Sequence, residues 1–233
     1  MNEIKEMLFN QGASIVGFAD LRDLPERVRF NLDYGISIGI RLNPKIIENI
    51  QSGPNRQYHQ EYLRVNQLLD QLSSKIASIL RSKGYQAMSI AATVEGMNNY
   101  DLSTLLPHKT VATKAGLGWI GKNALLITKS FGSAIRLTTV LTNIEFSSAE
   151  PIKTSLCGSC QACVEGCPAN AIIGKNWHLG IPRNKIYNTF LCSDFMQKLV
   201  KKMKINNRIC GQCIVSCPWT KKYIIRYKNV EEF

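Results

Sequence analysis

Residues 157–168 read CGSCQACVEGCP, and this stretch decides the fold. Three cysteines recur at spacings of three residues, and a fourth follows directly before a proline. Such a run wraps three thiolates around one cubane iron–sulfur cluster and directs the fourth thiolate to a second cluster. The proline turns the chain and removes a backbone donor. We therefore predict a two-cluster segment organised by metal ligands.

A second run, CGQCIVSCP over residues 210–218, repeats the pattern without its first cysteine. Asn207 stands where that cysteine would be, and Cys192 is the spare thiol upstream. The eight cysteines then provide four thiolates for each of two clusters. We assign one cluster to Cys157, Cys160, Cys163 and Cys217, and the other to Cys167, Cys192, Cys210 and Cys213.

Two zinc sites of four thiolates each are the main alternative for these eight cysteines. Zinc sites usually show paired C-x2-C knuckles separated by a longer spacer, whereas both runs here end in Cys-Pro. A disulfide framework is disfavoured in a reducing compartment. The spacing therefore favours iron–sulfur clusters over zinc.

Composition and charge limit the function further. The 233 residues are 45% hydrophobic, which is enough to bury a core. The start lacks a basic region followed by an apolar one, and no apolar run would span a bilayer, so we expect a cytoplasmic protein. The net charge of +12 favours docking of an acidic redox partner over nucleic-acid binding, since no RNA-reading aromatic motif is present.

The cysteines divide the chain into two regions. All eight follow Pro151, after the polar stretch 147–151, and the preceding region has none. We predict an α+β protein, with a mixed α/β cofactor or substrate domain over 1–150 and a helical two-[4Fe–4S] ferredoxin-like domain over 151–233. In the first region, hydrophobic periodicity predicts helices over 1–11 and 58–83 and strands over 14–19, 85–94, 124–128 and 134–143. The second should contain short helices between cysteine loops.

Residues 116–123, GLGWIGKN, satisfy the G-x4-G-K pattern of a phosphate-binding loop. Asn123, however, stands where the magnesium-binding Ser or Thr belongs. A helix-like stretch over 110–115 precedes the loop and an apolar strand follows it, which reverses the required order. We therefore interpret it as a tight turn or as the lining of a cofactor cavity.

Several segments together resemble the epoxyqueuosine reductases, cobalamin-dependent iron–sulfur enzymes of tRNA modification. The most specific are residues 115–123, AGLGWIGKN, and the two cysteine runs, the second followed by Trp219. The opening 12–19, GASIVGFA, and the Tyr58-His59 pair are also similar. The resemblance implies a mixed α/β catalytic domain that holds a base-off cobalamin beside two [4Fe–4S] clusters.

Two departures from that family bear on the substrate. The family's acidic proton donor corresponds to Leu102, which cannot donate a proton, so Asp101, Tyr100 and His108 are the candidate replacements. The family's tRNA enzymes also continue into a C-terminal helical-repeat domain, whereas this chain stops just past the second cysteine run. We therefore expect a truncated paralogue with another substrate, for which tRNA is a doubtful partner.

The predicted cofactor-binding residues are Gly118, Trp119, Lys122 and His59. Lys122 would meet an anionic side chain of a corrinoid or substrate, and Trp119 is either a core residue or a stacking platform. We expect Trp219 to shield a cluster from water and His178 to lie at the surface.

Three functions are compatible with these features. The first is an iron–sulfur reductase that passes electrons through a corrinoid to an unidentified substrate. The second is an electron-transfer protein that reduces a separate partner, such as a corrinoid protein, without turning over a small molecule. The third is an enzyme acting on tRNA. In each, a low-potential ferredoxin or flavodoxin would supply electrons.

Overall fold

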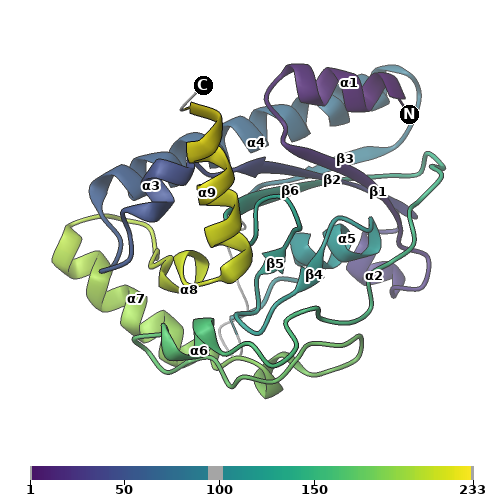
Figure 1. The fold of residues 1–233 in the computed structure, drawn as a ribbon. Helices are drawn as coiled ribbons and strands as arrows, with labels where there is room; N and C mark the ends of the chain where they lie inside the picture. Colours follow the sequence, from purple (N-terminus) through teal and green to yellow (C-terminus); the bar gives the residue numbers. More distant parts are fainter. Residues whose placement is uncertain (1, 94–101, 232–233) are drawn as a thin grey trace. The chain divides into compact units, whose positions relative to one another are not determined.

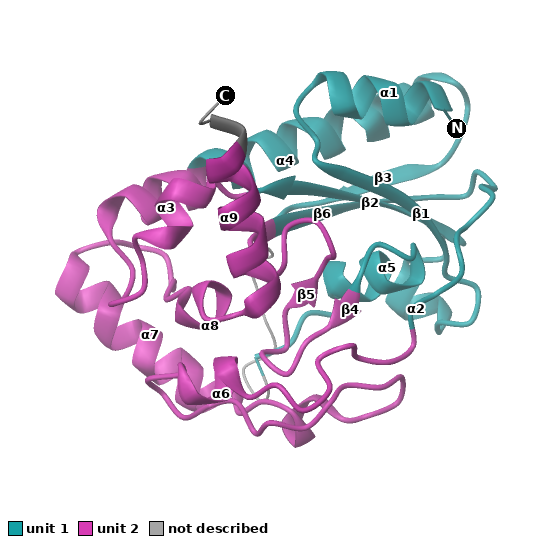
Figure 2. Ribbon diagram, in the orientation of Figure 1, with its two compact units in different colours: residues 1–41, 64–118, 136–152 teal, residues 42–63, 119–135, 153–233 magenta. Residues whose placement is uncertain are grey.

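The computed structural model describes residues 2–93 and 102–231 of the chain (Figure 1). These residues divide into two compact units, which are described separately (Figure 2). Unit 1 contains residues 1–41, 64–118 and 136–152, and unit 2 contains residues 42–63, 119–135 and 153–233.

Unit 1 is built on a four-stranded sheet with strand order β1-β2-β6-β3. Strand β1 runs antiparallel to β2, and β3 runs antiparallel to β6. In Figure 1, α1 and α4 lie along one face of this sheet and α5 lies along the other. The elements are α1 (Asn2–Asn10), β1 (Ile15–Asp20), α2 (Glu26–Arg29), β2 (Tyr34–Arg41), α4 (Arg56–Ser82, whose first residues belong to unit 2), β3 (Ala87–Ile90), α5 (His108–Lys114) and β6 (Ile135–Thr142).

Two glycines allow α5 to pack closely on the sheet. A Cβ atom at Gly17 would lie 2.9 Å from the Cβ of Ala115, and one at Gly35 would lie 2.8 Å from Cγ1 of Val111. Real Cβ atoms do not approach this closely, so any larger residue would push the helix away. Val111 is fully buried as a result.

Unit 2 contains short elements joined by the cysteine loops. A small hydrophobic core of Ile120, Ala124, Trp177 and Ile186 supports one part of it. The hydroxyl of Tyr223 donates a hydrogen bond of 2.9 Å to the carbonyl of Leu42. The elements are α3 (Pro44–Glu48), β4 (Trp119–Ile120), β5 (Leu126–Ile127), α6 (Ala162–Glu165), the 3-10 turn η1 (Arg183–Lys185), α7 (Thr189–Met203), α8 (Gln212–Val215) and α9 (Pro218–Glu231).

The α+β fold class predicted from the sequence is confirmed, and α1, β1, α4 and β6 lie close to their predicted ranges. Strand β2 was not predicted, because seven of its eight residues are buried and it lacks the alternation of a half-exposed strand. Helices α7 and α9, at 15 and 14 residues, are longer than the short helices expected. Residue 94, the end of one predicted strand, lies outside the described residues.

The units do not follow the two consecutive segments predicted as domains. One change of unit, after Ile152, lies close to the predicted boundary at residue 150, but unit 2 also takes residues 42–63 and 119–135. The assignment of separate cofactor and cluster domains stays a prediction. None of the described helices combines the length and the hydropathy that a membrane span requires.

Replacing Gly132 with alanine should destabilise unit 2. Gly132 has φ of +56°, and an added Cβ would lie 2.3 Å from the backbone nitrogen of Thr220 in α9. Positive-φ strain and this collision together should lower the free energy of unfolding by about 2 to 4 kcal/mol, measured by anaerobic urea denaturation. Gly180→Ala is the matched control. Gly180 has φ of +89° but nothing within 4 Å of the added atom, so only about 1 kcal/mol should be lost. Equal losses in both variants would contradict the close approach.

Candidate iron–sulfur site

Four cysteines from two distant segments of unit 2 face one cavity of about 100 Å³. Three come from the first cysteine run and one, Cys217, comes from the second. These are the four thiols that the sequence analysis placed on one cluster. The lining residues are Lys122, Asn123, Ile127, Cys157, Cys160, Cys163, Cys217, Pro218 and Trp219.

Local turns aim these thiols inward. The backbone N–H of Cys160 donates to the carbonyl of Cys157 at 3.1 Å, which closes the first loop, and Cys163 lies in α6. Cys217 directly precedes α9, and its sulfur accepts backbone N–H groups of Trp219 and Thr220. Backbone donors on a cluster sulfur stabilise its negative charge and influence the reduction potential.

Burial makes free thiolates unfavourable in this cavity. It raises the pKa of Cys163 to about 12, and the neighbouring charges of Cys157, Cys217 and Cys160 contribute in the same direction. Burial also raises the pKa of Cys217. Buried thiolates that repel one another need a positively charged centre between them, and an iron–sulfur core provides one. The donor set therefore fits a cluster chemically.

A tetrahedral zinc site holds each sulfur about 2.3 Å from the metal, so the sulfurs of such a site lie close together. The four thiols here line a cavity, which is compatible with a larger cubane core. The preference for clusters over zinc rests on the spacing of the cysteines in the sequence.

The other four cysteines form a second group in unit 2. Cys192 lies in α7 and Cys213 in α8. Burial raises the pKa of Cys213 well above its ordinary value, and Cys210, Cys192, Cys163 and Cys167 add to the shift. Cys163 of the first set is thus among the neighbouring thiols that raise the pKa of Cys213.

Tyr187, which the sequence analysis did not single out, lies beside the second group of thiols. Its hydroxyl donates to the sulfur of Cys192, which lowers the pKa of that thiol, although burial dominates and raises it overall. The phenol itself has a raised pKa because it is buried beside the thiols. An isolated tyrosine between two cysteines gives no periodic signal, so only tertiary contact could identify it.

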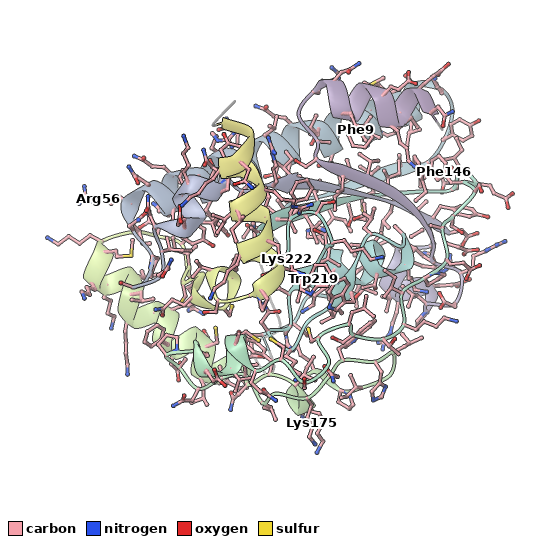
Figure 3. The ribbon with its side chains drawn as sticks, in the orientation of Figure 1. Phe9, Arg56, Phe146, Lys175, Trp219 and Lys222 are labelled. Carbon is pink, nitrogen blue, oxygen red and sulfur yellow. The ribbon has the colours of Figure 1, made fainter. Side chains whose placement is uncertain are left out.

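The predicted cofactor-binding residues lie in both units. Gly118 is a buried residue of unit 1, and its φ is not positive. In unit 2, the ring of Trp119 packs edge-on against Trp219, with centroids 5.2 Å apart. Trp219 lines the cavity at the start of α9, beside Lys222 (Figure 3). The expected shielding of a cluster by Trp219 stays a prediction.

Lys122 and His59 have defined partners in unit 2. The ammonium of Lys122 is buried and donates to the carbonyl of Cys160 at 2.8 Å. His59 Nε2 lies 2.9 Å from Oδ1 of Asn207, the residue at the place of the absent cysteine. Their predicted contact with a corrinoid stays a prediction.

His108, a candidate proton donor, begins α5 in unit 1. Nδ1 lies 2.9 Å from Oγ1 of Thr139, and Nε2 lies 2.9 Å from the carbonyl of Ala91. Burial lowers the pKa of His108, so the ring is neutral at neutral pH and a poor acid. The alternatives Tyr100 and Asp101 lie outside the described residues. His178 is exposed, as expected.

The glycine-rich loop is not a phosphate-binding loop. Helix α5 precedes it, and residues 121–124 form the turn between β4 and β5, where a P-loop would continue into a helix. A Cβ at Gly121 would lie 2.3 Å from Cδ1 of Ile127, and Ala124 has φ of +58°. The loop therefore forms a tight turn, and two of its residues, Lys122 and Asn123, also line the cavity. Its predicted contact with a cofactor stays a prediction.

Comparison with known protein families also indicates an iron–sulfur protein. Residues 156–220 match the 4Fe-4S double cluster binding domain family. The chain is therefore an iron–sulfur protein with a domain for two [4Fe–4S] clusters.

Curated relatives of this chain belong to one family of iron–sulfur enzymes. The epoxyqueuosine reductase of Listeria monocytogenes is 38% identical over 131 residues, which cover 54% of this chain and 33% of that protein. The Aliivibrio fischeri enzyme is 30% identical over 169 residues, covering 72% of this chain and 41% of that protein. The chain is a homologue of the epoxyqueuosine reductases, and it spans less than half the length of these two relatives.

Solved structures share the fold. Epoxyqueuosine reductase from Streptococcus thermophilus superimposes with a TM-score of 0.59 and 20% identity, over 94% of this chain and 66% of that one. A reductive dehalogenase, whose structure suggests a mechanism for B12-dependent dehalogenation, superimposes with a TM-score of 0.69 and 18% identity. The match covers 98% of this chain and 33% of that one. At these identities the likeness concerns the fold.

Paired cysteine substitutions would test the crossed assignment of ligands. Cys163→Ala/Cys217→Ala removes two thiols of one predicted set, so the protein should keep the other cluster and about four of eight irons. Cys163→Ala/Cys167→Ala removes one thiol from each set and should lose both clusters. Iron and sulfide are measured after anaerobic purification. The reverse result, with Cys163→Ala/Cys217→Ala losing both clusters, would show that the ligands do not cross.

His108 should make unit 1 less stable in mild acid. Its pKa is lowered in the folded state, so below the unfolded value of 6.5 the unfolded chain binds a proton that the folded chain does not. The free energy of unfolding should therefore decrease as pH falls from about 6.5 to the lowered pKa. His108→Gln should show a smaller decrease in anaerobic urea denaturation at pH 7 and pH 5.5. His178→Gln, which changes an exposed histidine, is the control. An unchanged pH dependence in His108→Gln would contradict the assignment.

Proposed function

We propose that this chain is a reductase of the epoxyqueuosine reductase type, in which two [4Fe–4S] clusters deliver single electrons to a corrinoid and from there to a substrate. One observation carries this proposal. Four thiols from both cysteine runs surround one cavity, beside the second group of thiols. Neighbouring clusters with crossed ligands form a path for one electron at a time.

In this proposal the clusters supply electron transfer and the chain controls their surroundings. Cys157, Cys160, Cys163 and Cys217 would hold the first cluster, and Cys167, Cys192, Cys210 and Cys213 the second. Pro218 and Trp219 line the first cavity. The Tyr187 hydroxyl donates to a sulfur of the second set. Hydrogen bonding and burial are the two means by which a protein sets a cluster's potential.

One structural feature is compatible with a corrinoid. The indole Nε1 of Trp119 is buried without a hydrogen-bond partner among the described residues, which leaves a donor for a bound group. A bound corrinoid would supply a strongly reducing cobalt centre. Asp101 remains the proposed proton donor.

A second candidate is electron transfer to a separate protein. Phe190 and Leu191 are 50% and 46% exposed at the start of α7, next to Cys192. Exposed Lys198, Lys201 and Lys202 continue along the same helix. An apolar patch beside a cluster ligand and near basic residues would suit an acidic redox partner.

Metal and cofactor analysis after anaerobic purification separates the two functions. About eight irons with matching sulfide are expected for the proposed clusters. Saturable binding of added cobalamin, followed by its reduction when dithionite-reduced protein is mixed with it, supports the corrinoid reductase. Full iron content without cobalamin binding favours the electron carrier, and protein with zinc or without iron rejects both. Asp101→Ala should keep both clusters and cobalamin but lose product formation.

The possibility that tRNA is the substrate can be tested with the same protein. A related epoxyqueuosine reductase has been solved with an epoxyqueuosine-modified tRNA-Tyr stem loop. Salt-sensitive binding of such a stem loop, in clear preference to an unrelated hairpin, would support tRNA as the substrate. Equal binding of an unrelated hairpin would indicate only the general attraction of a basic protein.

A further inference from the structure

The turn between β4 and β5 contacts the backbone of both cysteine runs. Lys122 Nζ donates to the carbonyl of Cys160 at 2.8 Å, and the next residue, Asn123, donates from Nδ2 to the carbonyl of Cys213 at 3.3 Å. All of these residues belong to unit 2. Two adjacent side chains therefore reach the two predicted ligand sets, one with a positive charge and one without.

The turn is built to hold these side chains. Asn123 Oδ1 accepts the backbone N–H of Leu125 at 3.2 Å, and the N–H of Gly121 bonds to the carbonyl of Leu125 at 2.9 Å. Ile127 leaves no room for a Cβ at Gly121. Lys122 and Asn123 are only 2% and 3% exposed.

The burial of Lys122 requires a nearby negative charge. An ammonium group removed from water is costly unless it is paired, and a neutral carbonyl satisfies only one of its three donors. Among the described residues that line the cavity, the other ionisable groups are the four cysteine thiols. Four thiolates on a cluster would supply the missing negative charge.

We infer that Lys122 is a positioning residue that raises the reduction potential of the cluster held by Cys157, Cys160, Cys163 and Cys217. The inference rests on the proposed function, since it requires that cluster. Each reduction adds one electron and hence one negative charge to the cluster, which a buried cation stabilises. Asn123 brings no charge to the Cys213 side. Because a buried cation lies beside only one ligand set, the electron should reside on the cluster of Cys157, Cys160, Cys163 and Cys217.

The test is a redox titration of anaerobic holoprotein, followed by electron paramagnetic resonance. Lys122→Gln should lower the midpoint potential of one of the two couples and leave the other in place. A tenfold lower ratio of reduced to oxidised cluster corresponds to about 59 mV for one electron, and we expect a shift of at least that size. Lys122→Arg keeps the charge and should stay near the wild-type value. Lys175→Gln removes an exposed charge of unit 2 and should change neither couple (Figure 3).

The outcomes distinguish this inference from the proposed function. Wild-type protein without two clusters would reject the proposed function, whatever Lys122 does. With both clusters present, unchanged couples in Lys122→Gln, or equal shifts of both couples, would overturn the role of its charge. If Lys122→Gln loses iron while Lys122→Arg keeps it, the cation is needed for assembly, which supports the pairing. Equal loss of iron in both variants would show that only side-chain shape matters and would overturn it.

Discussion

Unit 2 depends on bringing mutually repelling thiols together in a buried place. The thiols of Cys163 and Cys213 both have pKa values raised by burial and by neighbouring cysteines. Such a group is unfavourable as free thiolates and chemically suited to a metal–sulfur core. Because the core contributes binding energy only when its ligands are in place, cluster binding and folding of this unit are coupled.

The segments around the thiols are organised for the same purpose. Residues 119–135 lie far from the cysteine runs in sequence, yet they belong to unit 2 and contribute the hairpin whose turn reaches both runs. Gly132 approaches the backbone of Thr220, and the N–H of Ser133 donates to Oγ1 of Thr220 at 3.1 Å. Cys217, three residues before Thr220, thus has a neighbour anchored from another part of the chain. Precise placement of cluster ligands requires such supporting contacts.

Unit 1 has a different organisation, in which hydrophobic packing on a sheet is sufficient. Helix α5 approaches the β1–β2 pair closely because Gly17 and Gly35 carry no side chain. The contact of partly buried His108 with buried Thr139 satisfies one ring nitrogen, and the carbonyl of Ala91 satisfies the other. Buried polar groups that find partners in this way specify a unique arrangement at little cost.

The sequence by itself predicted which thiols would bind metal and roughly where the periodic elements lie. Cysteine spacing and the helical period of α4 are local patterns, and each can be read from one continuous stretch of sequence. The sequence also predicted that Cys217 shares a set with Cys157, Cys160 and Cys163, and the structure brings these four thiols to one cavity. Tertiary structure alone decided that Lys122 is buried beside them and that Tyr187 donates to Cys192. These contacts join residues from distant segments, and no single-chain periodicity encodes such distances. Strand β2 was not predicted because nearly all of its residues are buried, and burial on both faces removes the alternation of apolar and polar residues that marks a strand.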